Sequence, residues 1–125
     1  MFLTELLQGV DGIRVPFEPE GFKHVYQMYC VTLNSQIFNR DEFVEFLRKR
    51  GIEASVHFYP PLHQVSFYMK YYPLAESLPK TELLSSEIVT LPMYPQLTED
   101  ELTYIASNVK GALDYSHRSE SVSEI

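Results

Sequence analysis

The chain has little cysteine and no long apolar run. Cys30 is the only cysteine among 125 residues, so no internal disulfide bond can form, and a reducing cytosol fits this composition. No apolar run approaches the ~20 residues that a membrane-spanning helix requires. The first residues, MFLTELLQGV, lack the basic start and long apolar stretch of a signal peptide. The sequence therefore predicts a cytoplasmic protein that does not act in a membrane.

Basic residues are also scarce. Ten Lys and Arg stand against 17 Asp and Glu, which gives a formal net charge of −7. Recognition of a nucleic-acid backbone needs clustered cations, so this balance argues against a nucleic-acid partner. The densest basic run, at 48–50, falls at the end of a predicted helix, where cations complement the helix dipole.

Several site motifs are missing. The five glycines form no glycine-rich loop that would hold a phosphate group. His24, His57, His63 and Cys30 lack the paired short spacings of structural zinc sites. No serine lies in a nucleophile elbow, and a cysteine inside a strand is a poor nucleophile without a lowered pKa. These patterns predict neither a catalytic triad nor a zinc centre.

The hydrophobic pattern predicts one α/β domain, since 125 residues suit a single domain. Runs rich in β-branched and aromatic residues predict strands at 13–15, 24–33 and 53–59. The run at 24–33 is apolar on both faces, so we expect it to be central or covered. Residues 2–8 have helical spacing but are too few for an independent helix. They resemble the last turns of a longer helix, as expected if the chain is truncated on this side.

Three further helices are predicted from their end signals. Asn39 and Glu42 have the spacing of a capping box, and Gly51 ends the helix that they begin. Thr98 and Glu101 form a second such pair, before a helix whose inward face holds Leu102, Ile105, Val109 and Leu113.

The remaining helix and the chain end follow from composition. Pro79 is expected to start a helix that runs to about Ile88, with Leu83, Leu84 and Ile88 facing inward. Residues 115–125, YSHRSESVSEI, are polar and aperiodic, and we predict a disordered tail there. The folded domain is thus expected to span residues 1–114.

The segment ASVHFYPPLHQVSFY, at 54–68, is the candidate binding region. It carries His57 and His63 around Pro60-Pro61, and it enters a loop at 60–78 that is long for a compact domain. Aromatic rings and histidine donors suit sugar rings or diphosphates. The same residues also suit a packed corner with a satisfied core histidine. The residues alone leave both interpretations open.

Several short motifs follow one another along the chain: HVYQMY at 24–29, RDE at 40–42, RGI at 50–52, VHF at 56–58, PLH at 61–63, Tyr68, LPMYP at 91–95 and LT at 97–98. Their order resembles a known family, the DegT/DnrJ/EryC1/StrS aminotransferases. The resemblance is to the C-terminal small domain of these enzymes. They depend on pyridoxal 5'-phosphate and aminate keto groups of nucleotide-linked sugars.

The resemblance implies a fold and a site. The fold is a small antiparallel sheet of about three strands, covered by helices on one side and facing the large domain on the other. The implied substrate-binding residues are His57 first and then His63, with Phe58 and Tyr59 as packing or stacking residues and His24 as a further candidate. The implied partners of the complete enzyme are a nucleotide-linked sugar, glutamate and the large cofactor-binding domain, in a homodimer.

The family's Schiff-base lysine belongs to the large domain. The five lysines of this chain match no such position: Lys23, Lys49, Lys70, Lys80 and Lys110. The chain alone is therefore not expected to bind the cofactor or to transaminate. A non-catalytic ligand-binding or regulatory module and a gene remnant that still folds stay open as alternatives, because a fold does not fix a function.

Overall fold

The centre of the molecule is a three-stranded antiparallel sheet. The computed structural model describes residues 1–74 and 76–123, with side chains up to residue 115. The sheet contains β1 (Ile13–Arg14), β2 (Tyr29–Leu33) and β3 (Ile88–Leu91) in the order β1-β2-β3. In β2 and β3, Cys30 lies opposite Thr90 and Val31 lies opposite Val89. The predicted α/β class with a three-stranded antiparallel sheet is confirmed.

Helices cover the apolar face of this sheet. They are α1 (Phe2–Leu7), α2 (Arg40–Arg48) and α5 (Glu99–Ser123), of which α5 contacts both others. Alternate residues of β2 are buried under them, because successive side chains of a strand point to opposite faces. The fully buried Tyr29 hydroxyl lies 2.9 Å from Thr4 Oγ1, and burial raises the pKa of Tyr29. This contact between Thr4 and Tyr29 therefore joins α1 to β2, the middle strand.

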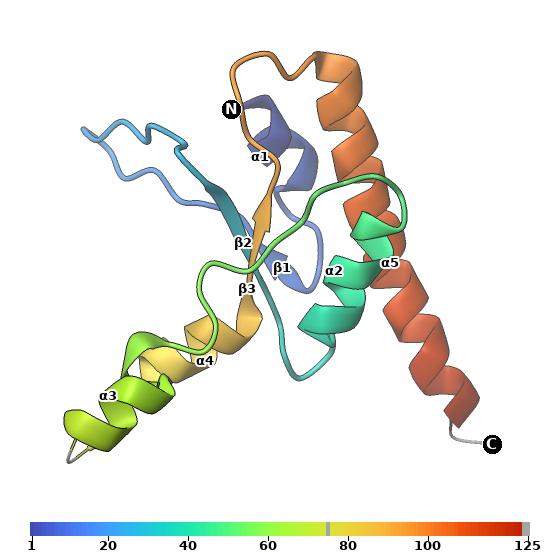
Figure 1. Ribbon diagram of the computed structural model, residues 1–125. Helices are drawn as coiled ribbons and strands as arrows, with labels where there is room; N and C mark the ends of the chain where they lie inside the picture. The colour runs from blue at the N-terminus through green and yellow to red at the C-terminus, as the bar shows by residue number, and fades with distance from the viewer. Residues whose placement is uncertain (75, 124–125) are drawn as a thin grey trace.

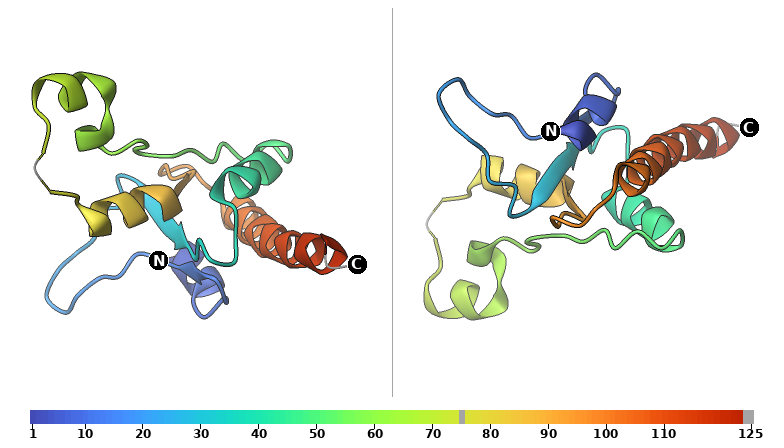
Figure 2. Two further views of the ribbon diagram at one scale, coloured as in Figure 1. Left: turned by 90° about the horizontal axis from the view of Figure 1, so that it is seen from below. Right: turned by 90° about the horizontal axis from the view of Figure 1, so that it is seen from above.

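The remaining helices extend away from this core as an arm. The arm, defined as residues 58–74 and 76–84, holds the 3-10 turn η1 (Leu62–Gln64), α3 (Ser66–Tyr71) and most of α4 (Pro79–Glu87). In Figures 1 and 2, α3 and α4 lie on the opposite side of the sheet from α2 and α5. The segment at 60–78 that was predicted as a loop thus contains two short helical elements, η1 and α3.

The cap of α2 follows from the sequence. Asn39 Oδ1 accepts hydrogen bonds from the backbone N–H groups of Asp41 and Glu42, at 3.0 and 3.2 Å. Phe43, Val44 and Leu47 are buried on one face of the helix. Gly51 follows with φ of +75°, a left-handed conformation that glycine adopts without a Cβ penalty.

The capping box of α5 is present in both directions. The Glu101 carboxylate accepts from the Thr98 N–H at 2.8 Å, and Thr98 Oγ1 accepts from the Glu101 N–H at 3.2 Å. The Thr98 N–H and hydroxyl lower the pKa of Glu101. A lowered folded-state pKa means that this contact stabilises the fold above the unfolded pKa of glutamate and is lost as pH falls through the folded pKa. The four predicted inward residues of α5 are all buried.

The sequence predicts a disordered tail at 115–125, whereas the described backbone of residues 115–123 is helical. The backbone of α5 continues to Ser123, while residues 124–125 lie outside the described part of the chain. No proline or glycine follows Gly111, so nothing in the sequence stops a helix that has already started. No helix in the described residues is long and apolar enough to cross a membrane.

Two strand predictions need correction. The predicted strand 24–33 is regular only from Tyr29, and Tyr26 has φ of +49°. Local bonds replace the ladder in this segment: the His24 N–H donates to the Glu18 carboxylate and the Tyr26 N–H donates to His24 Nδ1. Such side-chain acceptors compete with strand pairing.

The predicted strand 53–59 contributes only one bridge, between Ser55 and Thr90. The third strand is β3, which begins where helix was expected to end. The side chains of Val89 and Leu91 are buried in the core. The prediction that Leu83 and Leu84 of α4 face inward is also wrong, since they are 54% and 47% exposed. The buried residue of α4 is Ser85. Its carbonyl accepts a hydrogen bond from Arg40, and its hydroxyl donates to the Phe58 carbonyl.

The Asn39 cap predicts a measurable stability effect. Asn39→Ala removes the acceptor of two first-turn N–H groups and should lower the free energy of unfolding by about 1 kcal/mol. The matched control is Asn108→Ala inside α5, where alanine is the better helix former, so stability should be unchanged or slightly higher. Urea unfolding midpoints measure both. Equal midpoints for the two variants would contradict the role of the cap.

Candidate functional site

The face of the sheet opposite the core carries polar side chains around His57. His57 Nδ1 lies 3.0 Å from Thr90 Oγ1 and 3.4 Å from Ser55 Oγ, and Thr90 Oγ1 lies 3.5 Å from Cys30 Sγ. Strand register explains the grouping, because Thr90 is paired with both Cys30 and Ser55. Directly paired residues of an antiparallel sheet project to the same face. We refer to Cys30, Ser55, His57 and Thr90 as the polar-face cluster.

The residues after His57 leave the sheet and are exposed. Phe58 is 72% exposed and Tyr59 is 59% exposed. The His57 and Phe58 rings meet edge to face at 5.2 Å between centroids. The structure therefore brings three of the predicted site residues together, with a half-buried histidine beside two exposed aromatic rings.

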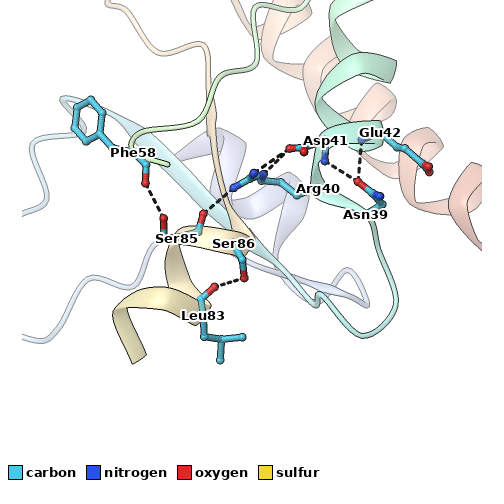
Figure 3. A network of polar contacts seen from close by, with 8 residues as sticks. All are labelled: Asn39, Arg40, Asp41, Glu42, Phe58, Leu83, Ser85 and Ser86. Carbon is cyan, nitrogen blue, oxygen red and sulfur yellow. Dashed lines mark hydrogen bonds and ion pairs between the residues drawn. The ribbon is translucent and has the colours of Figure 1, made fainter. Parts of the chain in front are cut away.

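A hydrogen-bond network fixes the backbone of this segment (Figure 3). Arg40, at the start of α2, donates to the Ser85 carbonyl at 2.7 Å and pairs with Asp41 at 2.9 Å. The Ser85 hydroxyl donates to the Phe58 carbonyl at 2.8 Å. The Arg40 guanidinium also lies 4.7 Å from the centre of the Tyr59 ring. This network connects α2, α4 and the His57–Tyr59 segment.

Sequence reasoning missed the roles of Arg40 and Ser85. Arg40 entered only as part of a motif, and Ser85 gave no signal of its own. A serine in a helix whose neighbours are Leu83, Leu84 and Ser86 reads as an exposed residue. Only the packing of α4 beside the loop makes its hydroxyl a partner of Phe58.

His63 belongs to a different cluster from His57. Its Nε2 lies 3.0 Å from Glu82 Oε1, which connects η1 to α4. An ionised carboxylate only accepts, so His63 Nε2 is the donor. The Leu78 N–H donates to the same carboxylate at 3.0 Å. The His63 bond first and the Leu78 bond second lower the pKa of Glu82.

His24 lies in a third place, on the loop between β1 and β2. Its ring centroid is 4.2 Å from that of Tyr26, and its Nδ1 accepts from the Tyr26 N–H at 2.9 Å. Its contacts therefore lie within its own loop. Across the described residues, no group of three or more His, Cys, Asp or Glu could hold a metal ion.

Comparison with known proteins identifies the family. The model of the DegT/DnrJ/EryC1/StrS aminotransferase family matches residues 1–110. The chain belongs to this family. A dTDP-3-amino-3,4,6-trideoxy-alpha-D-glucose transaminase of Micromonospora megalomicea is 36% identical over 96 residues, which are 75% of this chain and 24% of that relative. The uncharacterized protein MJ1066 of Methanocaldococcus jannaschii is 31% identical over 110 residues, 86% of this chain and 28% of the relative.

Solved structures give the same fold. The aminotransferase TlmJ from Streptoalloteichus hindustanus superposes with a TM-score of 0.77 at 29% identity, over 90% of this chain and 29% of that one. A family aminotransferase from Brucella abortus has a TM-score of 0.74 at 30% identity, over 87% and 28% of the two chains. The chain thus spans less than a third of the length of these relatives.

The five lysines of this chain all lie at its surface. Lys49 is paired with Glu45 at 2.7 Å on the surface of α2, and the Lys70 ammonium lies 5.0 Å from the centre of the Tyr71 ring. The other lysines are exposed: Lys23, Lys80 and Lys110. The side-chain contacts within the polar-face cluster are made by Cys30, Ser55, His57 and Thr90 alone among the described residues, and none involves a lysine. A Schiff base with the cofactor needs an available amine that is held at the site.

The His63–Glu82 contact predicts a change in one carboxyl pKa. His63→Gln removes the imidazole that is the main cause of the lowered pKa of Glu82, so that pKa should rise toward its usual value. The remaining Leu78 bond should keep the rise incomplete. NMR titration of the side-chain carboxyl carbon measures it, and His24→Gln is the matched control.

His63→Gln should also weaken the pH dependence of the free energy of unfolding. Because the folded-state pKa of Glu82 is lowered, the contact stabilises the fold above the unfolded pKa of glutamate, about 4.3, and is lost as pH falls through the folded value. An identical Glu82 titration in wild type and His63→Gln would show that the contact is not formed in solution.

Proposed function

We propose that residues 1–114 act as the small-domain part of a pyridoxal-phosphate-dependent aminotransferase that transfers an amino group to a nucleotide-linked keto sugar. The observation that carries this proposal is the family match over residues 1–110. It is supported by superposition on sugar-aminotransferase relatives over most of the chain. The setting would be cytoplasmic synthesis of polysaccharide or antibiotic sugars.

The His57–Tyr59 segment is the proposed substrate-binding part. His57 is half-buried with Nδ1 held by the sheet, while Phe58 and Tyr59 are exposed. Aromatic faces and an imidazole nitrogen suit a sugar ring with its hydroxyl groups. His63 and His24 remain predicted substrate contacts. A ligand would have to compete with Glu82 for His63 and with the Tyr26 N–H for His24.

The cofactor is proposed to be held by a separate large domain. The described lysines of this chain are exposed or paired on the surface, so the Schiff-base lysine must come from that domain. The chain alone is then inactive, and glutamate is the proposed amino donor of the complete enzyme. The amino-group chemistry belongs to the cofactor. The contribution of this chain is to bind and orient the sugar.

The exposed arm predicts self-association of the isolated chain. Its apolar side chains are unusually exposed: Phe58, Tyr59, Leu62, Phe67, Tyr68, Met69, Tyr71, Tyr72, Leu74, Leu78, Leu83 and Leu84. Patches of this kind favour association. The double variant Phe67→Ser/Tyr71→Ser should raise the dimer dissociation constant at least about tenfold, because truncating buried interface aromatics costs on the order of 1–2 kcal/mol each.

Sedimentation velocity over a concentration series measures this association. The control is Phe22→Ser, which removes a side chain that is 74% exposed but lies outside the arm. A wild-type chain that sediments as a monomer at every concentration would contradict the prediction.

A histidine variant tests the proposed function. The chain is co-expressed with the large domain of a family member that lacks its own small domain, and amino transfer from glutamate to a dTDP-linked keto sugar is assayed. Activity should require both parts. His57→Ala should lower the rate several-fold through loss of a sugar contact, with the circular dichroism spectrum unchanged.

The control for this assay is Phe17→Ala, an exposed aromatic that lies outside the arm. It should leave the rate unchanged. No activity in the wild-type pair, together with no binding between the parts, would favour a non-catalytic module. An active pair whose rate is unchanged by His57→Ala would return His57 to a purely structural role.

A further inference from the structure

Thr90 is a buried polar residue at the centre of the polar-face cluster. It is 7% exposed, one of only two buried polar residues in the part of the chain whose side chains are described. Burying a hydroxyl without a partner costs free energy, so such groups are nearly always hydrogen-bonded. Here Thr90 Oγ1 lies 3.0 Å from His57 Nδ1 and 3.5 Å from Cys30 Sγ.

The backbone holds Thr90 firmly in place. The Thr90 N–H donates to the Ser55 carbonyl at 2.8 Å, and the Ser55 N–H donates to the Thr90 carbonyl at 3.0 Å. On its other side Thr90 is paired with Cys30 in β2. Thr90 therefore has a paired segment on each side. Its hydroxyl is held in a fixed position, where it can orient the His57 ring.

The number of donors and acceptors favours one form of the imidazole. Two hydroxyl oxygens, from Thr90 and Ser55, lie within 3.4 Å of the single nitrogen Nδ1. One N–H can be shared between two oxygen acceptors, whereas one nitrogen lone pair accepts only one hydroxyl well. With the proton on Nδ1, the Thr90 hydroxyl is free to donate to Cys30 Sγ, a weak acceptor. Both hydroxyl oxygens then have a donor and Cys30 Sγ has one as well.

We propose that Thr90 is a positioning residue that, assisted by Ser55, holds neutral His57 with its proton on Nδ1. Nε2 is then left unprotonated as a hydrogen-bond acceptor. An acceptor nitrogen selects a donor on the ligand, which for a sugar is a hydroxyl group. That last step rests on the proposed function, whereas the positioning of the ring does not.

The first test uses the 125-residue chain without any ligand. The ¹⁵N shifts of the His57 ring are measured above the pH at which the ring is charged, where they report the tautomer. Wild type should show a protonated Nδ1 and an unprotonated Nε2. In Thr90→Val, a change of similar size that keeps the branched strand residue, the two nitrogen shifts should converge as the tautomers mix.

Two further variants complete this test. Thr90→Ser keeps the hydroxyl and should restore the wild-type shifts. Thr32→Val is the matched control, because Thr32 lies on the same sheet face but accepts from Arg14 Nε at 3.3 Å. It should leave the His57 shifts unchanged. A wild-type ring with its proton on Nε2, or shifts that are identical in Thr90→Val, would overturn the proposal.

The second test separates positioning from sugar binding. In the two-part enzyme described above, Thr90→Val should raise KM for the keto sugar several-fold and leave kcat nearly unchanged, and Thr90→Ser should behave like wild type. Loss of the tautomer with an unchanged KM would uphold the positioning role and overturn the sugar-binding role of Nε2. An inactive wild-type pair with the expected NMR result would contradict the proposed function alone.

Discussion

The antiparallel pairing of β2 with β3 is the constraint on which both the core and the candidate site depend. Because side chains alternate along a strand, one register places Val31 and Val89 in the core. The same register places Cys30 and Thr90 together on the opposite face, where His57 contacts Thr90. A slip of one residue would exchange these faces, so selection for a buried core also preserves the polar-face cluster.

The ends of the helices position the segment that follows His57. Asn39 caps α2, and the next residue, Arg40, extends to the Ser85 carbonyl. Ser85 in turn holds the Phe58 carbonyl. Buried polar networks of this kind add specificity when every member is satisfied. The exposed rings of Phe58 and Tyr59 thus stand on a fixed backbone, which lowers the entropy cost of binding a ligand.

Sequence predictions succeeded for features that depend on residues close together in the chain and failed for features that depend on residues far apart. The Asn39 cap, the Thr98–Glu101 capping box and the buried stripe of α5 depend on residues within a few positions, and these predictions are confirmed. The third strand depends on which segment pairs with β2 across more than fifty residues, and the prediction named the wrong segment. For the site, composition singled out the segment 54–68, and the family resemblance pointed to His57, Phe58 and Tyr59 within it. The partners Thr90, Ser85 and Arg40 come from distant segments, and no local pattern marks them.

The apolar side chains of this chain fall into two groups: those buried in the core and those exposed on the arm. The core between the sheet and α1, α2 and α5 is closed, with many side chains fully buried, among them Tyr29, Phe43, Leu47 and Val109. The arm contributes little to that core and exposes Phe67, Tyr71 and Leu83 instead. Exposed apolar area of this extent is costly in a monomer and is retained where a partner covers it. Phe58 and Tyr59 are the first residues of this arm, and Ser85, just beyond its other end, donates to the Phe58 carbonyl, so a partner bound to the arm would lie next to the candidate sugar contacts.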